Sequence, residues 1–426
     1  MLSPDLLPGE AINLYEGDGN LLIGQGNVAE TVPAMVRVWF DWNSGLRVEA
    51  AADRGPDRRP SRDDPIVVSL PDVSFHLDWI ATWDLFGPGP MSVSGSLSHV
   101  VTGDETALLD HVEFGLVNME KASLFKDAVD VQARGWSVRI DLVEDYDDRV
   151  AAIGAAGGGA LTHHAVLRRA DGSGFVWADA GEVLDAVRWV ASFVTGTRVP
   201  VLFPTAVDSN GQVVLREWGN VRRSQFGGVL SWCGDFQRAD AVRRLIPALL
   251  DASQDLSRRR RLAMALEFWL EAQLGSALET RLVAAVAGLE LMAWEWLVAV
   301  AGRDPDHVDR KKTVEWRLRS TLRLIGAPAD VPSHMTEVLA AWPGGDGPKA
   351  VTDLRHRVVH PKDLDALFDV SHSARHDVLR LATWYLELSL LRRLGYDGRY
   401  IARIAPLPIF AGEGDPVPWA ADSQAR

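Results

Sequence analysis

Residues 276–302, SALETRLVAAVAGLELMAWEWLVAVAG, decide the fold of the second half of the chain. The run begins with the capping-box pattern Ser276-x-x-Glu279, continues with apolar side chains at helical spacing, and stops at Gly302. Its longest apolar stretch, Leu282 to Ala301, still contains Glu290 and Glu295. We therefore expect a helix of a helical domain here and no membrane span.

Helical spacing extends outward from this run in both directions. We expect almost wholly helical structure beyond about residue 240, although Pro247 could kink or split the first helix. A long strand within 258–300 would contradict this reading. The further expected helices are 239–252, 258–274, 311–325, 331–342, a stretch containing 354–359, and 373–394.

The first half has a different pattern. Segments such as 35–40 and 137–142 alternate or carry β-branched and aromatic residues, which predicts strands, and turn residues such as Gly17-Asp18-Gly19-Asn20 separate them. A helix is expected over 181–194, and a hairpin at Asp208-Ser209-Asn210-Gly211. The fold class is therefore α+β: a β-rich (α+β) N-terminal domain over 1–237, an all-α bundle over 238–400, and a loosely ordered C-terminal tail within 401–426.

Composition narrows the class of protein. The chain has 426 residues, of which 47% are hydrophobic and 24% charged, values typical of a globular protein. A single cysteine, Cys233, excludes an intramolecular disulfide and suits a reducing compartment. The first residues do not resemble a signal peptide, so we expect a cytoplasmic protein. The net charge of −14 is concentrated in the first half, while 241–400 is nearly neutral and permits a local basic surface.

One short segment, Asp353-Leu354-Arg355-His356-Arg357-Val358-Val359-His360-Pro361, carries residues suited to RNA cleavage. Histidine titrates near neutrality and can take a proton from a 2′-hydroxyl or give one to a leaving oxygen. Arginine is permanently charged and can bind two phosphate oxygens. His356 and His360 are four residues apart and share a helix face, and Pro361 predicts that the helix ends near His360. The alternative is that these cations only cap the helix terminus and complement its dipole.

The same segment resembles the signature of the HEPN family. In that signature an arginine is followed by a polar residue and, a few positions later, by a histidine that often precedes proline. The earlier helical stretch 284–291, with Glu290, resembles the glutamate-bearing helix of HEPN proteins. A β-rich front followed by this domain is similar to ApeA-like bacterial defence proteins. The resemblance implies that Arg355, His356 and His360 are catalytic in a metal-independent ribonuclease, with two motifs paired across a homodimer.

Other charged groups are weaker candidates. Arg258, Arg259, Arg317 and Arg357 could contact RNA phosphates, but a solvated or salt-bridged face is the better explanation of such arginines. His372 and His376 have the spacing of a metal pair, yet no further cysteine or histidine completes a site. We therefore expect neither a metal nor a cofactor.

Two functions remain open. The first is an RNA endonuclease that acts on cellular RNA, including tRNA, as an anti-phage, abortive-infection effector. Its N-terminal domain would regulate it and would respond to a phage or host protein. The second is a non-catalytic dimeric scaffold with a ligand- or protein-sensing β domain. The two differ in one structural requirement, because a nuclease needs Arg355, His356 and His360 exposed.

Overall fold

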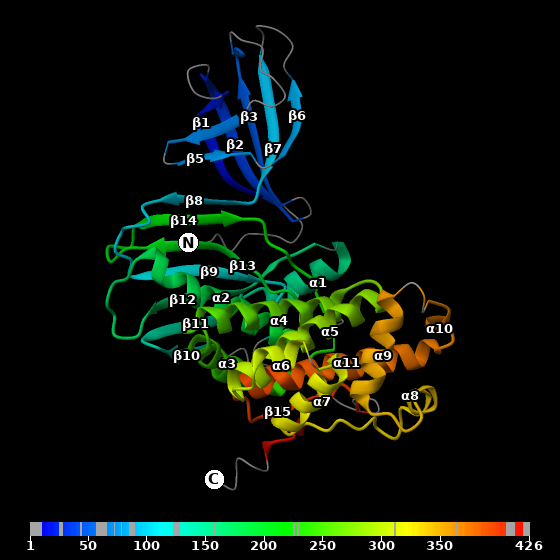
Figure 1. The fold of residues 1–426 in the computed structure, drawn as a ribbon. Coiled ribbons are helices and arrows are strands. Elements are labelled where there is room, and N and C mark those ends of the chain that lie inside the picture. Colours follow the sequence, from blue (N-terminus) through cyan, green and yellow to red (C-terminus); the bar gives the residue numbers. More distant parts are fainter. Residues whose placement is uncertain are drawn as a thin grey trace. The chain divides into compact units, whose positions relative to one another are not determined.

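The computed structural model describes residues 11–24, 29–42, 45–56, 66–71, 73–77, 79–84, 90–121, 128–156, 158–224, 226–227, 230–310, 312–360, 362, 364–405 and 414–420. The fold class is the expected one, α+β, with strands in the N-terminal part and helices in the C-terminal part (Figure 1). The chain divides into two compact units. Unit 1 consists of Met1–Asn118, Gly135–Leu184 and Pro200–Phe226, and unit 2 of Met119–Arg134, Asp185–Val199 and Gly227–Arg426. The predicted domain bounds at 237 and 400 stay a prediction.

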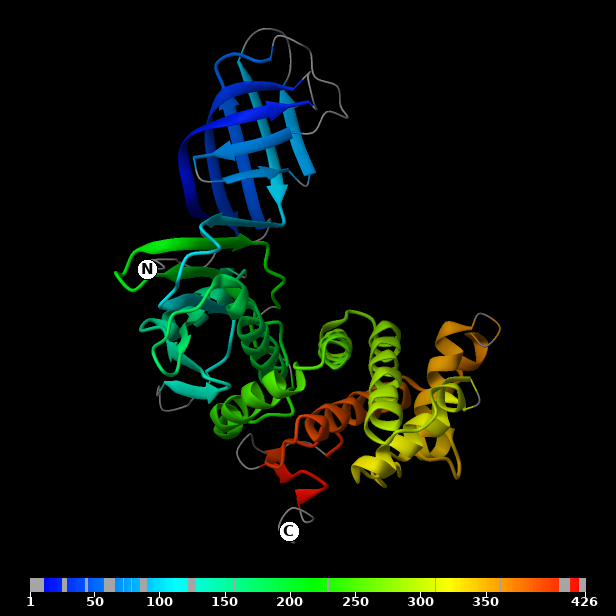
Figure 2. The same ribbon diagram turned by 60° about the vertical axis from the view of Figure 1, so that its left-hand side comes forward.

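A seven-stranded antiparallel sheet forms the first part of unit 1, in the order β5-β4-β1-β2-β3-β7-β6. Successive side chains of a strand point to opposite faces of the sheet, and those on one face form its core. In β2 every second side chain, including Val36, Val38 and Phe40, is buried. Figure 2 shows that this sheet is strongly curved. Its strands are β1 (Ile12–Ile23), β2 (Glu30–Asp41), β3 (Gly45–Ala52), β4 (Ile66–Leu70), β5 (Val73–His76), β6 (Trp79–Asp84) and β7 (Met91–Leu97).

The turn predicted at Gly17-Asp18-Gly19-Asn20 is wrong. These residues lie inside β1 and pair with residues 33–36 of β2. Close strand packing explains the glycine at position 19, because a Cβ there would lie 2.6 Å from the Ser69 carbonyl oxygen and 2.7 Å from a Val36 methyl group. Glycine inside a strand often marks such a close approach.

A second seven-stranded sheet has the order β10-β11-β12-β9-β13-β14-β8. The predicted hairpin is confirmed, since Asp208 Oδ1 accepts hydrogen bonds from the backbone N–H groups of Asn210 (2.9 Å) and Gln212 (2.8 Å). The helix expected over 181–194 is also confirmed within α2. The elements are β8 (His99–Gly103), β9 (His111–Val117), β10 (Val129–Ala133), β11 (Trp136–Leu142), α1 (Tyr146–Ala156), β12 (Leu161–Arg169), α2 (Trp177–Thr195), β13 (Val201–Val207) and β14 (Val213–Gly219).

The C-terminal part is helical, as predicted, with no strand in 258–300, all of which the structure describes. In unit 2, α5 packs between α4 and α11, and α11 also packs against α9. Helices α5 and α11 approach closely at Gly288, where a Cβ would lie 2.6 Å from Leu386 Cδ2 and that side chain would have to shift. The elements are η2 (Asp235–Gln237), α3 (Arg238–Ala252), α4 (Leu256–Leu274), α5 (Leu278–Trp294), the π-helical η3 (Glu295–Val300), α6 (Pro305–Arg310), α7 (Val314–Ile325), α8 (Thr336–Ala341), α9 (Gly347–Val359), α10 (Leu364–Phe368), α11 (His372–Arg393), β15 (Arg399–Tyr400) and β16 (Asp415–Pro416).

Several details of the helical prediction differ from the structure. Helix α8 is shorter than the expected 331–342, the end of the helix expected over 276–302 is π-helical, and α6 and α10 were not among the expected helices. The capping box at Ser276 and Glu279 does not form, because Ala277 is the N-cap of α5 and no side chain caps the helix. Pro247 neither splits nor ends the first helix, since α3 runs through it from Arg238 to Ala252.

Among the described helices, the continuous segment Leu278–Val300 is long and apolar enough to cross a membrane, with a mean hydropathy of 1.7. Its place in the bundle accounts for this hydropathy, because it packs against α4 and α11 as a core helix. The fully buried Glu295 within it forms ion pairs with arginines of α4 and α11. The predicted cytoplasmic location and the predicted absence of membrane contact stay predictions.

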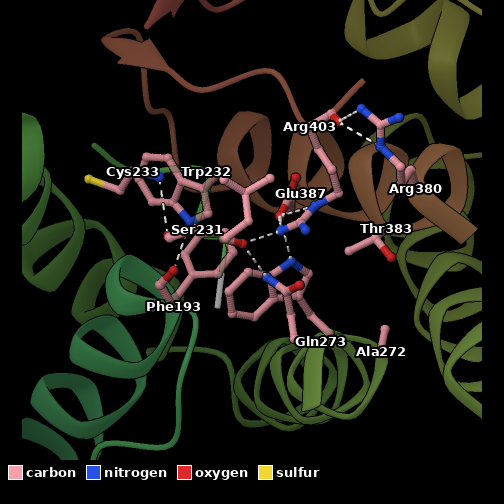
Figure 3. Close-up of polar contacts among 12 residues, drawn as sticks. Phe193, Ser231, Trp232, Cys233, Ala272, Gln273, Arg380, Thr383, Glu387 and Arg403 are labelled. Carbon is pink, nitrogen blue, oxygen red and sulfur yellow. Dashed lines mark hydrogen bonds and ion pairs between the residues drawn. The ribbon is translucent and has the colours of Figure 1, made fainter. Parts of the chain in front are cut away.

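The chain beyond α11 is anchored by polar contacts in the interior of unit 2 (Figure 3). Arg403 forms an ion pair of 2.6 Å with the fully buried Glu387, and Arg380 donates to the Arg403 carbonyl oxygen at 2.7 Å. Further on, Trp419 is buried and its Nε1 donates to the Tyr396 carbonyl oxygen at 2.8 Å. The prediction of a loosely ordered tail is therefore wrong for 414–420, while 406–413 and 421–426 lie outside the described residues.

Candidate active site

Helix α9 carries the predicted catalytic segment, and its start is fixed to α7. Asp346 is its N-cap and accepts a hydrogen bond from the Lys349 backbone N–H at 3.0 Å. The same carboxylate forms an ion pair of 2.6 Å with Arg319 of α7. Burial alone would raise the pKa of Asp346, but the hydrogen bonds from Arg319 and from the Lys349 N–H lower it on balance. The charged form is thus favoured, and it holds α9 in place.

The other end of α9 is the end that the sequence predicted. The helix stops at Val359, and His360 is the C-cap with an extended backbone (φ −114°, ψ 113°). The His360 backbone N–H donates to the His356 carbonyl oxygen at 3.1 Å. This geometry agrees with the expected effect of a following proline, although Pro361 itself lies outside the described residues.

The structure brings the two predicted histidines together. The ring centroids of His356 and His360 are 4.1 Å apart, with an angle of 43° between the ring planes. Of the three side chains that a nuclease was expected to expose, His356 is exposed, whereas Arg355 and His360 are half-buried, so this requirement is met only in part. Two imidazoles at this distance can both reach one bound phosphodiester, which is what acid and base roles in its cleavage require.

Arg355 lies beside this pair and lines a cleft of about 370 Å³ together with His356. Its side chain is half-buried, and no hydrogen bond or ion pair to another described residue holds its guanidinium. A guanidinium carries five N–H donors, which suits it to binding phosphate oxygens. The remaining lining residues are Thr313, Val314 and Glu315 at the start of α7, and Thr352 and Asp353 of α9.

The four weaker RNA-binding candidates all have partners inside unit 2. These contacts favour the alternative of a salt-bridged face, although RNA binding by these side chains stays a prediction. The partners are Glu295 for Arg258 (3.5 Å), Asp185 for Arg259 (3.0 Å), Glu290 and Asp309 for Arg317 (3.2 and 3.3 Å), and the Ala366 carbonyl oxygen for Arg357 (2.8 Å).

Reasoning from the sequence missed the wall of the cleft that α7 provides. Thr313 and Glu315 are about 40 residues before the motif, and no residue spacing links them to it. Asp353 is within the quoted motif, but nothing in the sequence showed that it faces the same cleft as Glu315. Only the packing of α7 against α9 brings these side chains together.

A metal site is not formed by the residues that the structure describes, since none of them make a group of three or more His, Cys, Asp or Glu side chains able to hold an ion. His372 and His376, the pair considered on spacing, lie at the start of α11. Burial and the nearby Arg380 lower the pKa of His376. The expected independence of a metal or cofactor stays a prediction.

Two regions of the chain match models of domains from the same protein, YopA. Residues 255–413 match the YopA C-terminal domain, and residues 104–229 match the YopA central domain. The chain is YopA-like in these two regions. A relative, the SPbeta prophage-derived uncharacterized protein YopA of Bacillus subtilis (strain 168), is 25% identical over 354 residues, or 77% of this chain and 76% of the relative. No solved structure matches the chain.

The YopA-like C-terminal domain contains the whole candidate site, from the α7 wall of the cleft to His360. The YopA-like central domain covers most of the second sheet. The resemblance of the motif to HEPN proteins, and of the layout to ApeA-like proteins, stays a prediction.

Proposed function

We propose that this chain is a metal-independent endoribonuclease whose catalytic residues are Arg355, His356 and His360. The observation that carries the proposal is the histidine pair at the end of α9, with rings 4.1 Å apart and Arg355 beside it. A role of these side chains in helix capping alone explains the position of Arg355 less well. The other arginines considered have partners within unit 2, whereas Arg355 lines an open cleft.

The chemistry follows from these three side chains. One imidazole takes the proton of the 2′-hydroxyl, which attacks the adjacent phosphorus, and the bond from phosphorus to the 5′-oxygen breaks. A second imidazole gives a proton to the departing 5′-oxygen. The Arg355 guanidinium stabilises the negative charge that develops on the phosphoryl oxygens. The products are a 2′,3′-cyclic phosphate and a 5′-hydroxyl.

The biological role that we propose is that of an effector in phage defence which cuts cellular RNA, tRNA included, in the cytoplasm. The relative from Bacillus subtilis is named as prophage-derived, which supports a role in conflicts between phages and their hosts. In this proposal the β-rich part regulates cleavage and responds to a phage or host protein.

Cleavage of total RNA by the purified chain is expected to persist in excess metal chelator, because the proposed proton transfers use side chains alone. The new ends should carry 2′,3′-cyclic phosphate, detected by resistance to a polyadenylating enzyme until the cyclic phosphate is removed. Complete dependence on a divalent ion, with 3′-hydroxyl ends, would contradict the proposal.

A homodimer that places two α9 termini close together is also expected. One copy offers a single Arg355 and one histidine pair, and two-fold symmetry doubles the groups available to one RNA. Light scattering coupled to gel filtration should give twice the chain mass of 46.7 kDa. A strictly monomeric protein that still cut RNA would contradict this arrangement.

A second candidate function is a non-catalytic dimeric scaffold whose β domain senses a ligand. The first sheet gives this alternative some support, because a cleft of about 760 Å³ lies against β1, β2 and β3 and is lined in part by Asp18, Met35 and Asp53. Clefts of this size are typical of small-ligand sites. Absence of RNA cleavage by the intact protein, together with specific ligand binding to this cleft, would favour the scaffold.

A further inference from the structure

The cleft beside Arg355 and His356 has two walls of different chemistry. Arg355 and His356 form one side, and Glu315 with Asp353 supplies two carboxylates. Both carboxylates are about one-third exposed, at 30% for Glu315 and 33% for Asp353. Asp353 lies on α9 with Arg355 and His356, and Glu315 lies on α7. Each carboxylate is paired with a cation, Lys349 or Arg319, but both still favour a ligand group with N–H donors over a phosphate, which Arg355 suits better.

Both carboxylates are held in fixed positions. Arg319 contacts Glu315 Oε1 at 2.7 Å, and Arg319 is itself fixed by Asp346. Lys349 contacts Asp353 Oδ1 at 2.8 Å, and this hydrogen bond raises the pKa of Lys349. In each of these ion pairs the contacts with described residues engage one carboxylate oxygen, and a carboxylate has a second oxygen that can accept. The cleft thus presents fixed acceptors to any group that offers N–H donors.

A nucleobase fits this description in size and chemistry. The cleft volume of about 370 Å³ is within the range of small-ligand sites. Proteins that read single-stranded RNA turn bases out of the stack and hydrogen-bond to their Watson–Crick edges. Thr313 and Thr352 add hydroxyl groups to the lining, and Val314 adds an apolar surface for a base to pack against.

We propose that this cleft binds the base next to the cleaved phosphate and prefers guanine, through Glu315 and Asp353. Guanine places two neighbouring donors, N1–H and the N2 amino group, on its Watson–Crick edge, and the second oxygens of Glu315 and Asp353 are the acceptors proposed for them. Adenine and cytosine place a ring nitrogen acceptor beside their amino group, and uracil flanks one N–H with two carbonyl oxygens. A carboxylate repels those acceptors. This inference rests on the proposed ribonuclease function.

The test compares cleavage of short single-stranded RNAs that differ only in one base flanking a single cleavable phosphodiester. The intact chain should cut next to guanine at least tenfold faster than next to uracil, since charge-assisted hydrogen bonds have this magnitude. Asp353→Asn and Glu315→Gln should each lower cleavage next to guanine toward the rate for the other bases. Asp306→Asn is the matched control, because Asp306 also forms an i,i+4 ion pair, with Arg310 of α6, but lies on the exposed surface.

Binding to the full-length His360→Ala protein separates this inference from the ribonuclease proposal. Guanosine 3′-monophosphate should bind at least tenfold more tightly than uridine 3′-monophosphate, and adding Asp353→Asn or Glu315→Gln should remove the difference. If the intact chain cuts no RNA but this preference appears and is lost in the variants, the nuclease proposal fails while the base site stands. Equal binding of both nucleotides, or a preference that both variants leave unchanged, would overturn the base site.

Discussion

His360→Ala is expected to slow RNA cleavage roughly 10²–10⁴-fold, the usual effect of losing a positioned acid–base group. Arg355→Ala is expected to slow it by roughly 10²–10³-fold, because a charge-stabilising donor disappears. The reason lies in the geometry of α9, where His360 is the C-cap and its ring lies 4.1 Å from that of His356. His356→Ala should have a milder effect if its role is to orient the phosphate or its partner ring. Cellular toxicity should fall in parallel with cleavage.

Matched controls distinguish chemistry from folding in this experiment. His334→Ala removes an exposed histidine outside the site, and Arg310→Ala removes an arginine whose side chain is 77% exposed. Both should keep full activity, since substitutions at such surface positions usually change stability by less than ~0.5 kcal/mol. Circular dichroism and the thermal midpoint should be unchanged for His360→Ala. Full activity of the His360→Ala protein would move the proposal toward the scaffold or toward another active site.

The sequence was sufficient to predict the helical part because its signal is local. The spacing of apolar residues along 276–302 is visible without any knowledge of tertiary structure, and the stop at Gly302 agrees with the observed end of the π-helical segment at Val300. The end of α9 was predictable for the same reason, since Pro361 acts on its immediate neighbour. The prediction was wrong where a residue type is explained by packing between parts of the chain that are distant in sequence. Gly19 was assigned to a turn, but it is needed where β1 passes close to Ser69 and Val36.

The site was predictable only in part. Arg355, His356 and His360 lie within six residues of one another, and the predicted helix face brings the histidines together. The cleft was not predictable, because its other wall depends on how α7 packs against α9. The same limit applies to Arg258 and Arg259 at the start of α4. Their role was ambiguous in the sequence because their carboxylate partners, Glu295 and Asp185, lie far along the chain.

The clearest case of such a hidden partner is Glu295. Its carboxylate is fully buried, accepts from Arg261 Nε at 2.7 Å and from Arg393 Nε at 2.8 Å, and lies 3.5 Å from Arg258 Nε. Three elements, α4, the segment after α5, and α11, therefore meet at one acidic side chain. If this carboxylate is removed, the three guanidiniums lose their shared counter-charge while they remain largely out of solvent. Removing one partner of a buried ion pair in this way is strongly destabilising.

Glu295→Ala is expected to lower the free energy of unfolding by about 3 kcal/mol, near the lower end of the ~3–5 kcal/mol that such losses cost, because the arginines partly reach solvent. Urea unfolding followed by tryptophan fluorescence measures the change. Glu279→Ala is the matched control: Glu279 is also on α5 and pairs with Arg375 at 3.1 Å, but its side chain is 38% exposed. An exposed pair of this kind contributes at most ~1 kcal/mol. If Glu295→Ala unfolded at the same urea concentration as Glu279→Ala, the guanidiniums would have found solvent or other acceptors, and Glu295 would not be the anchor of these three helices.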